Sequence, residues 1–117
     1  MTEPEPLLDV DALLASVGGD LELLDELAAT FAEEVPGWLG TLRTALASGD
    51  DEAVFRVAHG VNGAVGYFRA SGVQGPAAHL EALGRSRNLE GASAALDQLE
   101  DGLLKLNAFL AKTPWRT

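Results

Sequence analysis

The sequence predicts an all-α protein: an antiparallel four-helix up-down bundle with a short extra helix at the N-terminus. Three observations indicate this fold class. Four long segments repeat apolar residues at intervals of three and four, the spacing that places them on one face of a helix. No segment alternates β-branched residues between turn signals, as a strand would. The connections between the long segments are short, so consecutive helices are expected to be antiparallel neighbours.

Length and composition narrow the class of protein further. At 117 residues the chain has the size of one domain, expected to span residues 1–117 with a flexible lead over 1–7 and a tail over 112–117. The net charge of -10 argues against binding to nucleic acid. The lead lacks the basic and apolar regions of a signal peptide, and no apolar stretch approaches the ~20 residues that span a bilayer. Because there is also no cysteine to form a disulfide, we expect a cytoplasmic protein that does not bind membranes. We further expect it to be a monomer.

The first two predicted helices are separated by a pair of glycines. A short helix over residues 9–17 is expected to end at the glycines 18–19, and Asp20 is placed to accept hydrogen bonds from the first turn of the next helix. That helix covers residues 21–48 and contains Pro36. Its apolar spacing continues through the proline without a shift, which favours one kinked helix over two separate ones. Its expected core residues are Leu24, Leu27, Ala28, Phe31, Val35, Leu39, Leu42 and Leu46.

The helix expected over residues 50–70 turns a histidine outward. Asp50 is placed to cap it, and at about 100° per residue its apolar residues form a single stripe. His59 then lies about 140° from the centre of that stripe, on the outer face, together with Gly63 and Gly66. The residues expected to face the core are Val54, Val57, Ala58, Val61, Ala64, Val65 and Phe68.

Three glycines in this helix lower its intrinsic stability. Gly60, Gly63 and Gly66 each cost about 0.5–1 kcal/mol relative to alanine inside a helix. Burial of the apolar stripe can compensate, because helices in proteins owe most of their stability to packing. The glycines also leave the outer face around His59 without bulky side chains, so another molecule could approach the imidazole closely.

Two further helices complete the predicted bundle. The fourth begins either at Ser71, whose spacing to Gln74 matches a capping box, or at Gly75-Pro76, where proline would take the first helical position. It is expected to end near residues 87–88. The fifth covers residues 89–111. The residues expected to face the core are Ala77, Leu80 and Leu83 in the fourth helix and Ala92, Leu96, Leu99, Leu103, Leu106 and Leu110 in the fifth.

The residues around His59, Ala58-His59-Gly60-Val61-Asn62-Gly63, resemble the Ala-His-x-Leu-x-Gly pattern of the histidine-containing phosphotransfer (HPt) domains of bacterial and plant phosphorelays. The likeness extends over about residues 13–110, with Phe31 in the second helix and Leu80-Glu81 in the fourth. It implies a helical bundle whose third-helix histidine accepts a phosphoryl group from the aspartate of a receiver domain and passes it to another.

Two positions depart from the pattern of that family. The family usually has a lysine at the position of Asn62, where it helps to hold the phosphoryl oxygens, and often a glycine at the position of Arg69. The amide of Asn62 can still donate a hydrogen bond, but it carries no charge. The first departure therefore bears on the stability of the phosphorylated state and, to a lesser degree, on the rate of transfer.

The resemblance implies that His59 is the phosphoacceptor. An exposed imidazole is mostly neutral at pH 7, so one ring nitrogen can attack an aspartyl phosphate, which is a mixed anhydride. The Mg²⁺ that neutralises the developing charge is held by carboxylates of the partner, so no cofactor or bound metal is expected in this chain. The residues expected to contact the phosphoryl group or the partner are Asn62, Gly63, Gly66, Phe55 and Arg56. His79 is expected to be a partly exposed residue of the fourth helix and not a metal ligand.

We therefore predict a phosphorelay intermediate that meets a response-regulator receiver domain, a hybrid histidine kinase, or both. ATP-dependent kinase activity is not expected, since the sequence lacks a phosphate-binding loop of the GxxxxGK[ST] type. The alternative is a non-phosphorylated helical adaptor that binds a receiver or a kinase, and Asn62 keeps this alternative open. A purely structural bundle would leave the glycine-rich outer face unexplained.

Overall fold

The structure is a computed structural model that describes residues 8–116. Within these residues it contains five α-helices and no strand. They are α1 (Val10–Ser16), α2 (Leu21–Ser48), α3 (Asp51–Tyr67), α4 (Ser71–Arg85) and α5 (Ala92–Ala111). The predicted all-α class is confirmed. None of these helices is both long enough and apolar enough to cross a lipid bilayer. The lead predicted over residues 1–7 lies outside the described residues.

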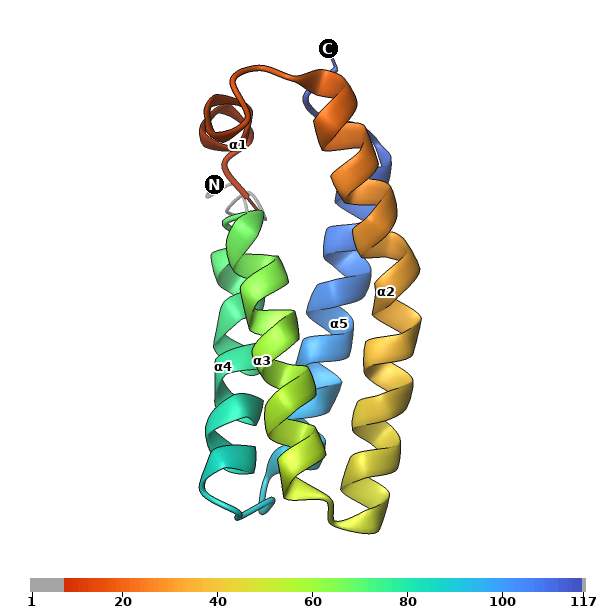
Figure 1. Cartoon of the computed structure of the whole chain (residues 1–117), viewed down its shortest axis with the longest axis vertical. Coiled ribbons are helices and arrows are strands. Elements are labelled where there is room, and N and C mark those ends of the chain that lie inside the picture. The colour runs from red at the N-terminus through yellow and green to blue at the C-terminus, as the bar shows by residue number, and fades with distance from the viewer. Residues whose placement is uncertain (1–7, 117) are drawn as a thin grey trace, which may run out of the picture.

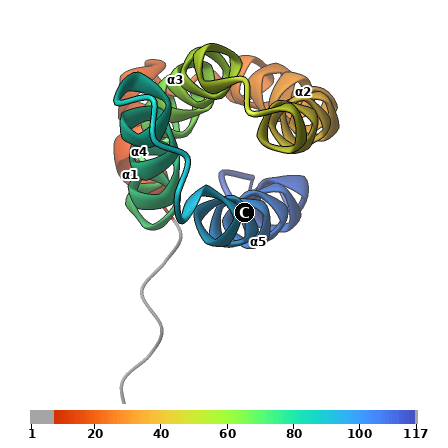
Figure 2. The ribbon, with the colours of Figure 1, turned by 90° about the horizontal axis from the view of Figure 1, so that it is seen from below.

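The four long helices lie side by side, and consecutive ones run in opposite directions (Figure 1). α3 packs against α2 and α4, and α5 packs against α4 and α2. The four helices therefore form a ring when viewed along their length (Figure 2). α1 lies at the end of the bundle where α2 begins and where the C-terminal tail ends (Figure 1). This arrangement agrees with the predicted bundle and its short extra helix.

The core is built from the predicted apolar stripes. Phe31 of α2 is buried, and its ring makes edge contacts with Phe68 and Trp38 at centroid distances of 5.3 and 5.6 Å, a favourable geometry for aromatic pairs. In α3 the predicted inward residues are buried, except that Val57 and Ala64 are partly exposed at its edge. The face of α3 that turns toward the core is therefore the predicted one, and the opposite face is free for the site.

Two questions about helix continuity are settled by the structure. α2 runs without interruption from Leu21 to Ser48 and carries Pro36 on its exposed side, so this segment is one helix and not two. α4 begins at Ser71, and Pro76 lies inside it. The earlier of the two possible starts of α4 is therefore the observed one.

The ends of α4 and α5 differ from the predicted ones by a few residues. α5 starts at Ala92, three residues later than predicted, because Gly91 has a φ of +81°. This left-handed conformation cannot continue a right-handed helix. α4 ends at Arg85, before the predicted end near residues 87–88, because Arg87 has a φ of +59°.

α3 ends at Tyr67, three residues before the predicted end, and the turn that closes it depends on Arg69. The amide of Arg69 donates to the carbonyl of Gly66 over 2.9 Å, and the amide of Ala70 donates to the carbonyl of Val65 over 3.0 Å. This closing pattern requires a left-handed residue, usually glycine, and Arg69 takes that place with a φ of +57°. A glycine at this position, as the family pattern often has, would adopt the positive φ without steric cost.

The C-terminal tail is bound to the first turns of α2. Trp115 is buried, and its Nε1 donates to Oδ1 of Asp25 over 2.8 Å. The guanidinium of Arg116 donates to Oδ2 of Asp25 over 2.6 and 2.9 Å. The hydrogen bonds from Arg116 and then Trp115 hold the pKa of Asp25 below its usual value. Within the predicted tail, residues 115–116 are thus tied to α2 by specific contacts.

Candidate functional site

His59 lies near the middle of α3 with 70% of its side chain exposed. Ala58, the residue before it, is fully buried, so the helix passes from core to solvent within one residue. Gly60 and Gly63 are exposed neighbours, and a Cβ built at either would meet no described atom within 4 Å. The imidazole is therefore open to another molecule, as the sequence predicted.

One side of the ring is held by a carboxylate from α4. Nδ1 of His59 lies 2.5 Å from Oε1 of Glu81, and only 14% of the Glu81 side chain is exposed. An ionised carboxylate accepts hydrogen bonds and cannot donate them, so Nδ1 is the ring nitrogen that carries the proton. In the neutral form of the ring, this tautomer leaves the lone pair of Nε2 facing solvent. The contact with Glu81 selects the nucleophilic nitrogen and orients the ring.

The close approach of α3 and α4 near this contact depends on Gly84. A Cβ built at Gly84 would lie 2.5 Å from the backbone nitrogen of Phe55 and 2.8 Å from its Cα. Both distances are far inside van der Waals contact, so only glycine fits there. Gly84 follows Glu81 by one turn and therefore helps to set how far Glu81 stands from His59. Neither role was predicted; the one signal for Gly84 was a glycine inside an otherwise regular helix.

Phe55 packs within the site and is only partly exposed. Its ring stacks on the His59 ring at a centroid distance of 5.9 Å and an interplanar angle of 24°. On α4, Cζ of Arg85 lies 5.2 Å from the centre of the Phe55 ring, a cation–π distance. Arg85 also lies near Glu81, with 3.8 Å between Nη2 and Oε2. Sequence reasoning placed Phe55 beside His59, but it did not identify Arg85.

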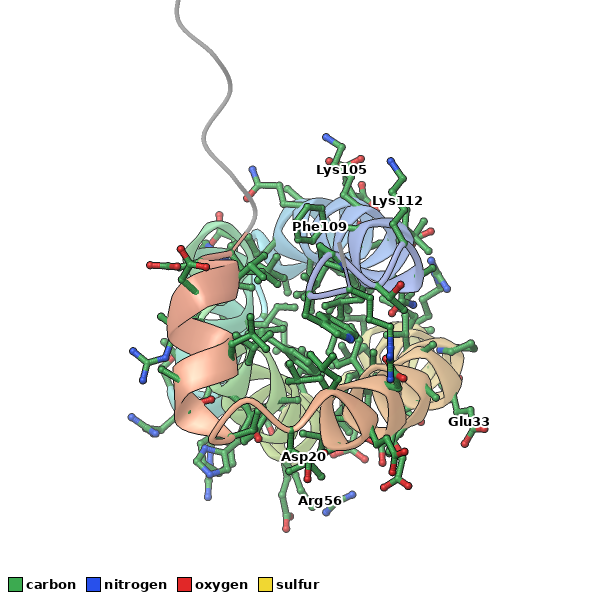
Figure 3. The ribbon with its side chains drawn as sticks, turned by 90° about the horizontal axis from the view of Figure 1, so that it is seen from above. Asp20, Glu33, Arg56, Lys105, Phe109 and Lys112 are labelled. Atoms are coloured by element: carbon green, nitrogen blue, oxygen red, sulfur yellow. The ribbon has the colours of Figure 1, made fainter. Side chains whose placement is uncertain are left out.

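The remaining predicted site residues lie around His59 in different ways. Asn62, one turn after His59, is partly exposed. Arg56 is exposed and points out of the bundle (Figure 3). Gly66 is less open than Gly63, because a Cβ built there would come within 3.0 Å of Nε2 of Gln74 on α4. The freely accessible part of the glycine face is therefore at Gly60 and Gly63.

The other histidine stands apart from this cluster. His79 lies on α4, as predicted, is exposed where partial exposure was expected, and has no described contact with His59. Within residues 8–116, no group of three or more His, Asp or Glu side chains is placed to hold a metal ion.

The fold and the site together define a class of protein: a helical bundle that displays one histidine to solvent, with a carboxylate behind its ring. The sequence profile of the Hpt domain matches residues 26–109, and the chain belongs to the Hpt domain family. Domains of this family take part in histidine phosphotransfer in two-component signalling and interact with kinases and receiver domains.

A solved structure with the same fold supports this assignment. The chain is similar to histidine-containing phosphotransfer protein B from Pseudomonas aeruginosa PAO1, with 28% sequence identity and a TM-score of 0.84. The match covers 97% of this chain and 99% of that protein. A comparison with curated protein sequences finds no match.

Proposed function

We propose that His59 is the phosphoacceptor of this domain and relays a phosphoryl group between receiver-domain aspartates. The observation that carries this proposal is the contact of Nδ1 of His59 with Glu81, which leaves Nε2 unoccupied on a side chain that is 70% exposed. A nucleophile on a protein surface needs an available lone pair and an approach path for the donor. His59 has both.

The transfer step follows from this geometry. The lone pair of Nε2 attacks the phosphorus of an aspartyl phosphate, the P–N bond forms, and the P–O bond to the aspartate breaks, so that the carboxylate of the receiver leaves. Positive charge develops on the imidazole as the P–N bond forms. Glu81, whose oxygen lies 2.5 Å from Nδ1, stabilises that charge. The receiver domain supplies Mg²⁺ for the charge on phosphorus.

The partner proposed is a response-regulator receiver domain, a hybrid histidine kinase, or both. One exposed histidine with its own supporting carboxylate forms a complete site, so the proposed active form is a monomer. We place it in the cytoplasm, as the sequence analysis expected.

The proposal is tested with receiver domains labelled at the aspartate. Wild-type protein, His59→Gln and His79→Gln are each mixed with a phosphorylated receiver and Mg²⁺. We expect an acid-labile, base-stable label on the wild type and on His79→Gln, and none on His59→Gln. The His79 variant is the matched control because that histidine is also exposed on the bundle. An unlabelled wild type, across receivers from the same organism, would contradict the proposal.

A non-phosphorylated adaptor is the second candidate, and the neutral Asn62 near His59 is the observation that favours it. An adaptor would bind a receiver or kinase without accepting label. Calorimetric titration with the same receivers separates the two functions, since an adaptor shows binding with an unlabelled His59, whereas a relay protein shows binding and label together.

A further inference from the structure

A phosphoryl group on His59 would create an electrostatic problem for the site. It would bring a charge of about -1.5 to -2 at pH 7. The imidazole already contacts the carboxylate of Glu81, and the chain as a whole carries a net charge of -10. Asn62, the polar side chain one turn after His59, is neutral. A phosphorylated His59 therefore needs a cation nearby, and the described residues show where one is available.

Most basic side chains of the chain are placed away from His59. Arg43 pairs with Glu100, and Arg116 pairs with Asp25. Lys105 and Lys112 lie on the side of the bundle that is opposite Arg56 (Figure 3). Arg69 follows His59 by ten residues and lies in the turn after the end of α3. Arg87 lies in the turn beyond the end of α4, where it lines one hollow with Phe55 and Arg85. The cations left on the helices beside His59 are Arg56 and Arg85.

Arg85 differs from Arg56 in contacting two residues that touch the His59 ring, Phe55 and Glu81. Its guanidinium lies over the ring of Phe55 at 5.2 Å, and that ring stacks on His59 at 5.9 Å. It also lies 3.8 Å from Oε2 of Glu81, the carboxylate that holds His59. Arg56 makes no ion pair among residues 8–116 and points away from the bundle (Figure 3).

The contacts that hold Arg85 are weak enough to be exchanged. A distance of 3.8 Å is too long for a hydrogen bond, and 67% of the Arg85 side chain is exposed. An exposed ion pair of this kind contributes little. Arginine and phosphate, by contrast, form paired, charge-assisted hydrogen bonds that are shorter and stronger. The guanidinium can therefore exchange its weak contact with Glu81 for a phosphoryl group.

We propose that Arg85 binds the phosphoryl oxygens of phosphorylated His59 and supplies the positive charge that Asn62 lacks. The proposal rests on His59 being the phosphoacceptor. In it, Phe55 guides the guanidinium toward His59 before phosphorylation, and Glu81 is shared between the imidazole and the arginine. Arg85 then stabilises the phosphohistidine relative to the aspartyl phosphate of the receiver.

The charge on the phosphohistidine gives a test that needs no partner. Potassium phosphoramidate phosphorylates histidine directly, and the ³¹P NMR shift of the product is followed against pH. All proteins carry His79→Gln, so that His59 is the one histidine to be labelled. A guanidinium beside the phosphoryl group favours its dianion. We therefore expect Arg85→Gln to raise the midpoint of the titration by about half a pH unit or more.

Matched variants separate a direct contact from a structural effect. Arg87→Gln removes the same charge from the turn after α4 and is expected to leave the midpoint unchanged. Arg85→Lys and the double variant Arg85→Gln/Asn62→Lys are expected to return the midpoint most of the way to the wild-type value, because each supplies a cation to the site. In the transfer equilibrium with a receiver, Arg85→Gln should lower the phosphohistidine fraction about 10-fold relative to aspartyl phosphate.

The outcomes distinguish failure of the role proposed for Arg85 from failure of the proposal that His59 is the phosphoacceptor. A His59 that accepts no label from phosphoramidate or from any receiver overturns both proposals. A labelled His59 with the same ³¹P midpoint in Arg85→Gln and wild type overturns the role of Arg85 alone. A shift that appears equally in Arg87→Gln shows a general charge effect and also overturns it. Circular dichroism confirms that each variant keeps its helices.

Discussion

Replacing Glu81 by alanine tests whether this α4 carboxylate controls the tautomer and the reactivity of His59 on α3. The contact removed is short, 2.5 Å between Oε1 and Nδ1 of His59, and joins a carboxylate that is 14% exposed to a ring that is 70% exposed. A hydrogen bond to a charged group contributes about 1.5–3 kcal/mol. The exposure of the ring places this one at the lower end. A loss of about 1.5 kcal/mol in the transition state corresponds to a transfer rate about 10-fold lower.

The rate is measured by rapid quench with a phosphorylated receiver, and the tautomer of His59 by ¹⁵N NMR of the imidazole. Wild type is expected to show the form protonated at Nδ1, and Glu81→Ala a mixture of both forms. Glu52→Ala is the control, since it removes an exposed carboxylate from α3 two turns before His59. A Glu81→Ala protein with unchanged rate and unchanged tautomer would refute the argument that Glu81 selects the nucleophilic nitrogen.

Four further predictions concern the scaffold. Gly84→Ala places a Cβ 2.5 Å from the α3 backbone and should destabilise the fold by about 1–3 kcal/mol in urea denaturation. Gly60→Ala, with open space around it, should stabilise by about 0.5–1 kcal/mol, and a loss of stability there would contradict the open face. Arg69→Gly should stabilise by about 0.5–1 kcal/mol, because glycine takes the φ of +57° without strain; no gain would show that the turn is unstrained. Asp25, whose pKa Arg116 lowers, should contribute stability above its usual value of 3.8 and lose that contribution as pH falls through the lowered pKa. Asp25→Asn should therefore lose stability at pH 7 and show a flatter pH dependence of unfolding below pH 4, and an unchanged profile would contradict the bond to the tail.

The helices and the exposed histidine could be predicted from the sequence because they depend on local geometry. A helix advances about 100° per residue, so the apolar stripe of α3 determines which face of the helix points outward. His59 lies on that outward face. Caps work in the same local way: Asp20 and Asp50 accept hydrogen bonds from Leu23 and Ala53, as their positions suggested. The errors at helix ends were also local, because the left-handed conformations at Gly91 and Arg87 had not been anticipated.

The composition of the site was decided by the tertiary structure. Glu81 follows His59 by 22 residues, and no periodicity within one helix tells which residue of a neighbouring helix comes within hydrogen-bonding distance of it. That choice depends on the register between α3 and α4, and the register depends on the backbone contact allowed by Gly84. The same packing brings Gln74 toward Gly66 and sets Arg85 over Phe55.

The sequence by itself therefore determined that this chain forms a helical bundle with a histidine in water. The tertiary structure alone decided which nitrogen of that histidine is held and which is left open, and which arginine lies over the ring that stacks on it. The physical reason is that side-chain direction along a helix is a property of the backbone of that helix, whereas the distance between two side chains on different helices is a property of how their surfaces pack.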